Sequence, residues 1–216
     1  MSAEKLFKAL QDEGIVGSHG KTTFSLGGIT TQAKDISVIG NLIQDWLAQF
    51  MRQNNIQFSQ PTNSQEFPDF YLSDSTTQDL LEVKCFTKSP NFDIANFHAY
   101  CRSLLTNAHR LDADYLIFKY SAHADYIEIQ NIWLKKVWQI SSRMERSDLK
   151  IQWKQNQAVN IRPGVWYSEK TKFPCFESRL AFVQAIEKIQ NTQSNRVPKW
   201  LDEVAQNYQK TMGNKL

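Results

Sequence analysis

The sequence FPDFYL at residues 67–72, with LLEVKCF at residues 80–86, decides the fold. Both runs are mainly apolar, and the polar residues 73–79 separate them, so they predict two strands joined by a loop. An amphipathic helix is predicted before them at residues 35–53. Its apolar residues recur three and four positions apart: Ile39, Leu42, Ile43, Trp46, Leu47 and Phe50.

Three charged residues stand inside these two runs. Because strand side chains alternate between faces, Glu82 and Lys84 point one way, while Leu81, Val83 and Cys85 point the other way. Charged groups in an apolar strand are costly to bury unless they pair or bind a metal. Asp69 precedes Glu82 by 13 residues, a gap that suits a strand, a loop and a return strand. We therefore expect the two carboxylates to lie side by side.

Two adjacent carboxylates with an adjacent lysine indicate metal-assisted chemistry on a phosphate. A divalent cation removes the repulsion between Asp69 and Glu82, and oxygen-only ligands favour Mg²⁺, with Mn²⁺ expected to substitute. Lys84 is placed to orient or deprotonate an attacking water and to offset charge in the transition state. The predicted catalytic set is therefore Asp69, Glu82 and Lys84.

The rest of the chain alternates helices and strands. Helices are predicted at residues 3–12, 93–107, 177–190 and 198–212, and residues 135–142 have a weaker helical pattern. Asp35 or Ser37 is expected to cap the helix at 35–53, and Asp93 the helix at 93–107. Strands are predicted around residues 14–26, 29–32, 56–58, 113–120, 126–134, 158–162 and 165–167, with Gly27-Gly28 as a turn. This order predicts the α/β class, with a mixed β-sheet core flanked by helices.

Composition indicates a globular protein and no membrane segment. Of 216 residues, 41% are hydrophobic and 22% charged, values typical of globular domains. No run approaches the roughly 18 apolar residues that span a bilayer, and the first residues lack the apolar core of a signal peptide, so a cytoplasmic location is expected. The three cysteines are scattered, which predicts reduced thiols rather than disulfides or a zinc site. Trp46, Trp133 and Trp138 are expected in the core.

Charge is distributed unevenly along the chain. Residues 1–82 carry 5 Lys and Arg against 10 Asp and Glu, whereas residues 135–172 carry 9 against 3. A basic stretch beside an acidic centre suits a polyanion held against metal-binding carboxylates, although an uneven solvated surface gives the same counts. We expect a single catalytic domain over residues 1–216. It would have a catalytic core at about 35–135, a basic part that recognises the polyanion at about 135–175 and C-terminal helices at about 177–212.

Pro68-Asp69 and Glu82-Val83-Lys84 together resemble the motif of the PD-(D/E)xK nuclease superfamily. The resemblance implies a mixed sheet flanked by helices, and Mg²⁺-dependent hydrolysis of DNA phosphodiesters to 5′-phosphate ends. Many members carry a further acidic residue on the preceding helix. Asp45 matches it as a metal ligand, Gln44 is a neutral alternative at the same place, and Glu66 is a lesser candidate.

Further segments resemble the type II restriction endonucleases of the NgoBV type. They are residues 88–97, 102–105, 113–118 and 132–138, and the resemblance covers most of residues 5–190. It implies action on the palindrome GGNNCC and a cognate methyltransferase that protects host DNA. A palindrome calls for two-fold symmetry, so a homodimer is expected.

DNA contacts are expected mainly from the basic stretch. Arg162, at a strand end beside the turn Pro163-Gly164, is the best candidate for reading guanine O6 and N7. The candidates for DNA binding are Lys88, Ser89, Asn91, Arg102, Lys136, Lys154, Asn160, Arg162 and Lys172. For any single lysine or arginine, an ordinary solvated position is the alternative.

Two other functions compete with a restriction endonuclease. A repair or junction-resolving nuclease can use the same core and would nick particular DNA structures instead of cutting plasmid into discrete fragments. A non-catalytic DNA-binding module would have lost a carboxylate or the lysine, and this sequence retains all three.

Overall fold

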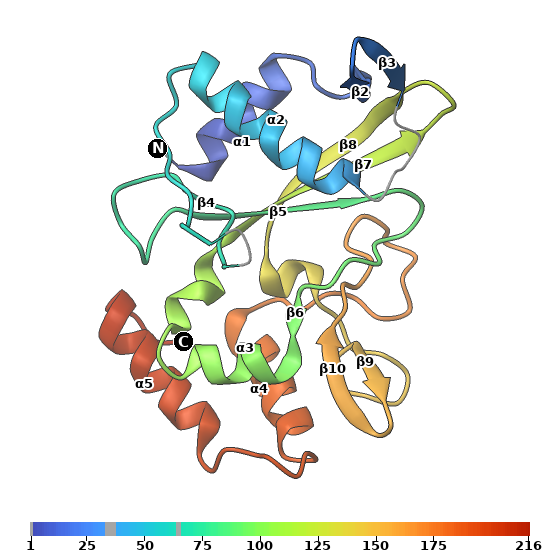
Figure 1. Ribbon diagram of the computed structural model, residues 1–216. Helices are drawn as coiled ribbons and strands as arrows, with labels where there is room; N and C mark the ends of the chain where they lie inside the picture. The colour runs from blue at the N-terminus through green and yellow to red at the C-terminus, as the bar shows by residue number, and fades with distance from the viewer. Residues whose placement is uncertain (1, 33–37, 64–65) are drawn as a thin grey trace. The chain divides into compact units, whose positions relative to one another are not determined.

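A computed structural model describes residues 2–32, 38–63 and 66–216 (Figure 1). The chain forms two compact units, each from two segments. Unit 1 comprises residues 1–89 and 114–134, and unit 2 comprises residues 90–113 and 135–216.

Unit 1 is built on a mixed five-stranded sheet in the order β1-β8-β7-β5-β4. Its strands are β1 (His19–Gly20), β4 (Phe70–Tyr71), β5 (Leu80–Phe86), β7 (Asp114–Ala122) and β8 (Ile127–Lys136), the last of which continues into unit 2. The central pair β5 and β7 is parallel, and β4 runs antiparallel to β5 with Phe70 opposite Leu81. This pairing places Asp69, one residue before β4, beside Glu82.

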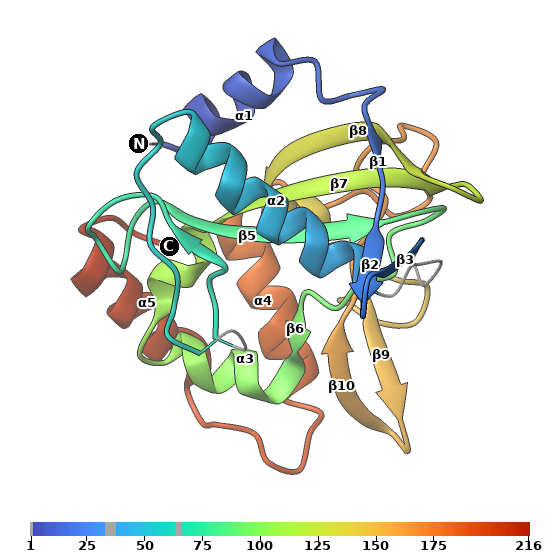
Figure 2. The same cartoon turned by 45° about the horizontal axis from the view of Figure 1, so that its top comes forward.

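Two helices cover one face of this sheet: α1 (Ala3–Asp12) and α2 (Ile39–Gln53) (Figure 2). Ile43 and Leu47 of α2 share one hydrophobic core with Leu81 and Val83 of β5. Leu81 and Val83 therefore face the helices, and the alternation of the strand turns Glu82 and Lys84 to the opposite face, as predicted.

A separate hairpin of β2 (Thr23–Leu26) and β3 (Ile29–Gln32) completes unit 1. Gly27 and Gly28 form its turn with positive φ values of 58° and 81°, a conformation that glycine adopts at little cost. The predicted hairpin is thus confirmed.

Unit 2 combines a three-stranded sheet with helices. The sheet has the order β6 (Ala95–Asn96), β10 (Gln157–Ile161) and β9 (Ile151–Lys154). The helices are α3 (Phe97–Leu104), α4 (Arg179–Gln190) and α5 (Trp200–Met212), with 3₁₀ turns η2 (Ala108–Asp112) and η3 (Val137–Ile140). Trp200 is buried, and its indole N–H donates to the Cys101 carbonyl over 2.8 Å, which ties α5 to α3.

Most predicted elements are confirmed, and the α/β class with a mixed, helix-flanked sheet is correct. The helix predicted at 93–107 begins only at Phe97, because residues 95–96 pair with β10. Its N-terminal cap is therefore Asn96, whose side chain accepts from the Ala99 N–H, and the prediction of Asp93 as cap was wrong.

Other strand predictions were wrong. Residues 56–58 and 165–167 form no strand, and β9 was not predicted. The strand expected at 67–72 is paired only at Phe70–Tyr71, since Pro68 has no N–H to donate to a ladder. The proposed caps Asp35 and Ser37 lie outside the described residues. No helix in the described ranges is long and apolar enough to cross a membrane.

Candidate active site

Asp69 is fixed by two elements of unit 1. Its Oδ2 accepts a hydrogen bond from the backbone N–H of Val83 on β5 over 2.7 Å. Its Oδ1 accepts from the side-chain amide of Gln44 on α2 over 3.0 Å. The carboxylate is thus held at the sheet edge, next to the strand that carries Glu82 and Lys84.

Glu82 and Lys84 form a close ion pair on the same face of β5. Lys84 Nζ lies 2.7 Å from Glu82 Oε1, with side-chain exposures of 20% and 11%. Glu82 Oε2 is buried and has no hydrogen-bond partner in the described part of the chain. A buried carboxylate oxygen without a partner is costly, so this atom is a place where a cation would be stabilised.

Burial raises the pKa of Asp69 to about 6, and the negative charge of Glu82 adds to the rise. The hydrogen bond from Val83, the charge of Lys84 and the hydrogen bond from Gln44 act in the opposite direction. Two carboxylates that interact so strongly share one site, and a proton on one of them relieves their repulsion. A divalent cation relieves the same repulsion.

Burial tends to lower the pKa of Lys84, but the charge of Glu82 and the hydrogen bond to it outweigh this effect. The pKa of Lys84 therefore lies above its ordinary value, and the side chain carries a full positive charge. In this arrangement Lys84 suits charge stabilisation and water orientation better than proton abstraction.

The donor set fits Mg²⁺. Among the described residues, no group of three or more His, Cys, Asp and Glu side chains gathers into a metal site. Mg²⁺ needs no such cage, because it keeps several waters and takes one or two carboxylates together with substrate phosphate. Asp69 and Glu82, whose Oε2 has no hydrogen-bond partner among the described residues, would supply these two carboxylates.

On α2 the structure favours Gln44 over Asp45 at this site. Gln44 contacts Asp69, whereas Asp45 is exposed. Neighbouring helix residues point about 100° apart, so both cannot face the same strand. Glu66 is exposed as well.

Unit 2 brings several predicted DNA contacts onto one face of the β9–β10 ribbon, which projects beyond the helices of the unit (Figure 2). Asn160 pairs with Gln152 in the ladder, and Asn160 donates to the Gln152 amide oxygen over 3.2 Å. Lys154 and Arg162 lie two residues from these partners, on the same face. A two-stranded ribbon of this kind fits the major groove of DNA.

Arg162 is held by its neighbours in unit 2. Its guanidinium donates to the Gln152 amide oxygen over 2.7 Å and to the Asn91 carbonyl, and lies 3.0 Å from Asp93. Sequence reasoning missed Gln152, although an alternating run such as Ile151-Gln152-Trp153-Lys154 is a strand signal. Since arginine only donates, Gln152 must turn its oxygen inward, which directs its two N–H donors away from Arg162.

The remaining candidates are scattered. Lys88 and Ser89 are exposed after β5 in unit 1, and Arg102 is exposed on α3 in unit 2. Lys136 donates to the Asp112 carbonyl over 2.7 Å, and Lys172 pairs with Glu145 over 2.8 Å. Lys136 thus has a contact that supports the fold itself.

Comparison with known proteins identifies the family. The model of the family described as NgoBV restriction endonuclease matches residues 1–216. The type II restriction enzyme NlaIV of Neisseria lactamica is 41% identical over 194 residues, covering 87% of this chain and 80% of the relative. The type II restriction enzyme NgoBV of Neisseria gonorrhoeae is 35% identical over 152 residues, covering 67% and 85%.

A solved structure agrees with the sequence relatives. The NlaIV restriction endonuclease superposes with a TM-score of 0.93 at 36% identity, covering all of this chain and 92% of that chain. The predicted membership of the NgoBV type of restriction endonucleases and the predicted fold class are thereby confirmed. The chain belongs to the NgoBV restriction endonuclease family.

Proposed function

We propose that this restriction endonuclease uses Mg²⁺ at Asp69 and Glu82 to hydrolyse double-stranded DNA at a short palindrome, leaving 5′-phosphate ends. One observation carries the proposal: two carboxylates and a charged lysine converge at the sheet edge, and the buried Glu82 Oε2 has no partner in residues 2–32, 38–63 and 66–216. Mn²⁺ is expected to replace Mg²⁺, since it accepts the same oxygen ligands.

The reaction would be attack of water on phosphorus, with cleavage of the bond to the 3′-oxygen. Bound by Asp69 and Glu82, the metal would supply a Lewis acid for the scissile phosphate and lower the pKa of water. Gln44 and the Val83 N–H hold Asp69 in place, so that its carboxylate needs no rearrangement to bind. Lys84, charged and tethered to Glu82, would orient the water and offset the charge that builds on the phosphate oxygens.

Sequence recognition is proposed for the ribbon in unit 2. Gln152, Lys154, Asn160 and Arg162 share one of its faces and offer donors to guanine O6 and N7. The family resemblance implies the site GGNNCC. By the same implication, the whole chain acts as one nuclease, a homodimer in which each subunit cuts one strand, and a methyltransferase protects host DNA. The expected cytoplasmic location rests on the first residues, which lack an apolar signal-peptide core.

Digestion of a plasmid of known sequence tests this proposal. With Mg²⁺ the wild type is expected to give discrete fragments whose sequenced ends carry 5′-phosphates, and with EDTA none. Asp69→Ala, Glu82→Ala and Lys84→Ala should abolish cleavage and retain sequence-specific binding. Lys8→Ala, an exposed lysine paired with Asp12, is the matched control and should cut like the wild type. A Lys84→Ala variant that cuts as fast as wild type would refute the mechanism.

A further inference from the structure

The β2–β3 hairpin carries an apolar face exposed to solvent. In its register Phe24 lies opposite Thr31, and Leu26 opposite Ile29, so these four side chains share one face. Phe24, Leu26 and Ile29 are 58%, 72% and 77% exposed. The other face carries hydroxyls, and Ser25 and Thr30 bond across it over 2.7 Å. The ribbon is therefore amphipathic, and its apolar side is uncovered.

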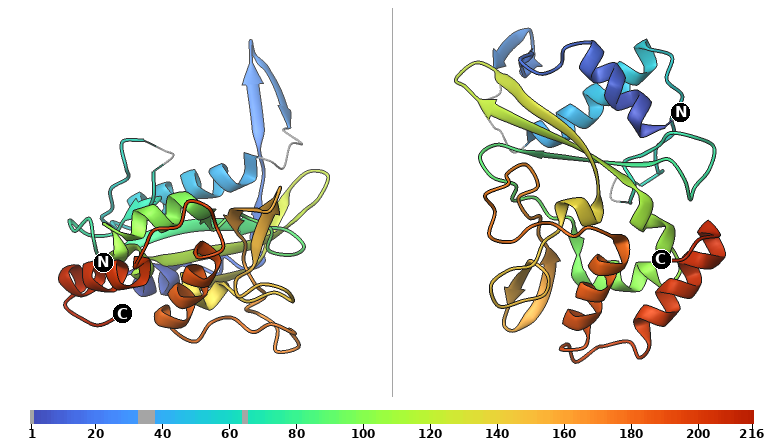
Figure 3. Two further views of the ribbon diagram at one scale, coloured as in Figure 1. Left: turned by 90° about the horizontal axis from the view of Figure 1, so that it is seen from below. Right: turned by 180° about the vertical axis from the view of Figure 1, so that it is seen from behind.

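Such a hairpin is marginal when it stands alone. Two strands without a covered face are barely stable in water, and Figure 3 (left) shows this hairpin projecting from the rest of unit 1. Residues 22–32 contain no charged residue. A segment without Lys or Arg makes a poor contact for DNA phosphates, so its apolar face calls for an apolar partner.

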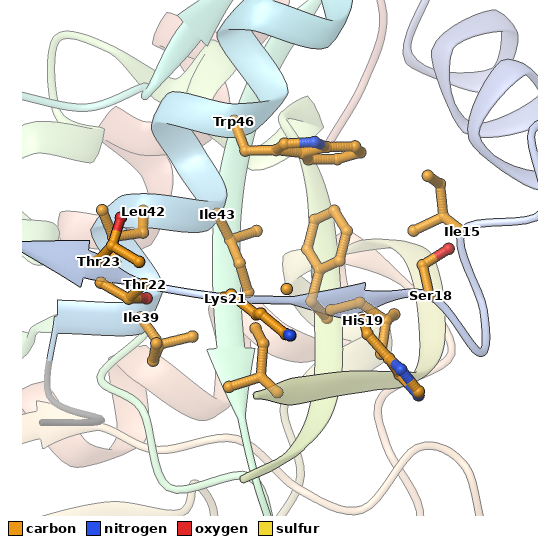
Figure 4. A pocket seen from close by; sticks show the side chains of 14 residues that line it. Ile15, Ser18, His19, Lys21, Thr22, Thr23, Ile39, Leu42, Ile43 and Trp46 are labelled. Atoms are coloured by element: carbon orange, nitrogen blue, oxygen red, sulfur yellow. The ribbon is translucent and has the colours of Figure 1, made fainter. Parts of the chain in front are cut away.

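Unit 1 also carries an apolar pocket of about 400 Å³. It lies between α2, the strands β7 and β8 and the segment leading into the hairpin. Leu42, Ile43 and Trp46 are among the residues of its α2 side. In Figure 4 Trp46 and Ile43 extend from α2 toward the segment that holds His19 and Lys21. Trp46 is 40% and Leu42 38% exposed, so the prediction that Trp46 is a core residue was wrong.

The exposed residues of α2 form a ridge beside this pocket. Leu42 and Trp46 are four positions apart on α2, and Val38, four before Leu42, is 39% exposed. Residues spaced by four lie on one helix face. Ile39, Ile43 and Leu47, on the neighbouring face, are buried in the core. The ridge is thus a second apolar surface of α2.

We propose that a second copy of this chain covers both surfaces, with the hairpin of each subunit docked on the α2 ridge and pocket of the other. Thr23, the first residue of β2, and Thr22 before it line the pocket, so the hairpin begins at the pocket rim, and it projects from the rest of unit 1 (Figure 3, left). The chain carries a projecting apolar hairpin and an apolar recess, so the hairpin of one copy can fit the recess of an identical copy. Reciprocal docking about a two-fold axis forms the same hairpin–ridge contact twice.

The chemistry of the two surfaces supports this partner. Each subunit would contribute six large apolar residues, namely Phe24, Leu26, Ile29, Val38, Leu42 and Trp46. Aromatic and aliphatic side chains of this kind form the centre of stable interfaces, with a polar rim around them. The two-fold symmetry rests on the proposed function, because a palindrome requires it, whereas the apolar surfaces do not depend on it.

Sedimentation of paired variants tests the surface. The wild type should sediment as a dimer. Leu26→Lys/Ile29→Lys should weaken dimerisation by on the order of 100-fold or more, while each subunit stays folded, because both side chains are exposed. The control Ser25→Lys/Thr30→Lys adds the same charge to the opposite face and should remain dimeric. A monomeric wild type, or equal dimerisation of both variants, overturns the proposal.

Cross-linking tests the reciprocal contact directly. A mixture of an Ile29→Cys chain and a Leu42→Cys chain, treated with a short bifunctional maleimide, should give a covalent heterodimer. A mixture of Ile29→Cys with Lys8→Cys, on the exposed face of α1, should not. Equal cross-linking in the two mixtures counts against the docking.

DNA cleavage, measured in parallel, separates this proposal from the proposed function. If the wild type dimerises through the hairpin but cuts no DNA, the interface proposal stands and the nuclease proposal fails. A dimeric Leu26→Lys/Ile29→Lys variant that has lost DNA affinity would assign the hairpin to DNA and overturn the interface, whereas the nuclease would stand.

Discussion

The ionised carboxylate of Asp69 lowers the free energy of unfolding at neutral pH when no metal is bound. Its pKa in the fold is about 6, against about 3.9 in an unfolded chain. A carboxyl whose pKa rises on folding stabilises the fold fully below the unfolded pKa, and this contribution is lost as pH rises through the folded pKa. In EDTA, Asp69→Asn should therefore raise the free energy of unfolding at about pH 7.5. The increase in the free energy of unfolding relative to wild type should be larger at about pH 7.5 than at about pH 4.5, by about 1–3 kcal/mol.

Urea unfolding at the two pH values measures this difference. Added Mg²⁺ should stabilise the wild type through binding to the folded state, and it should leave the Asp69→Asn variant nearly unchanged. Asp12→Asn, an exposed carboxylate on α1, serves as control. A gain that does not depend on pH would show that repulsion from Glu82 is not its cause.

We expect Gln44 to affect the reaction by positioning Asp69. Gln44→Ala removes the hydrogen bond to Oδ1 and should lower cleavage by roughly 10–100-fold, as is usual for residues that orient metal ligands. The Mg²⁺ concentration for half-maximal activity should rise with it. Asp45→Ala, at the adjacent exposed position, should change neither quantity. The opposite result would restore Asp45 as the ligand.

The sequence predicts the three charged residues better than their neighbour on the helix. The shared orientation of Glu82 and Lys84 follows from the two-residue period of a strand, because a strand side chain can point to only one of two faces. On α2 both Gln44 and Asp45 flank the apolar stripe, and the hydrophobic pattern does not decide which of them faces Asp69. That choice depends on how α2 packs on β5, which is a tertiary property.

At the scale of elements, runs with clear ends are predicted well. β5 matches residues 80–86 because polar loops bound an apolar run. β9 has only four residues, so its alternating apolar signal is short and was missed. Its pairing with β10 completes the strand. Residues 95–96 carry no strand pattern either, and they become β6 by pairing with β10.

Gln152 tests the role of the β9–β10 ribbon. Its oxygen accepts from Arg162 and Asn160, so its two N–H donors suit the acceptors of guanine in the major groove. Gln152→Leu should cost about 1–3 kcal/mol of discrimination between cognate and single-mismatch sites, measured by competition binding in Ca²⁺. Gln155, exposed at the tip between β9 and β10, gives the control Gln155→Leu. A loss that is uniform over all DNA sequences would contradict base reading.

Asp112 joins three elements of unit 2. It accepts two hydrogen bonds from Arg179 of α4, over 2.9 and 3.0 Å, and one from the buried Tyr208 hydroxyl of α5. Asp112→Ala leaves both donors without this partner and should lower the free energy of unfolding by about 2–4 kcal/mol. Asp148→Ala breaks the exposed pair with Lys188 and should cost less than about 1 kcal/mol. Equal effects of the two substitutions would argue against the Asp112 network.

At the scale of the whole molecule, each chain carries one copy of Asp69, Glu82 and Lys84, whereas a DNA duplex has two strands to cut. A homodimer with one active site per strand predicts a defined behaviour for mixed dimers. Co-expression of the wild type with a tagged Lys84→Ala chain should yield dimers with one working site. Such dimers should convert supercoiled plasmid to the nicked form and make linear DNA only slowly, by a second encounter. Mixed dimers of the wild type with tagged Lys8→Ala should linearise the plasmid directly. If the Lys84→Ala mixture linearises it as fast as that control, one subunit cuts both strands, and the division of labour between subunits is wrong.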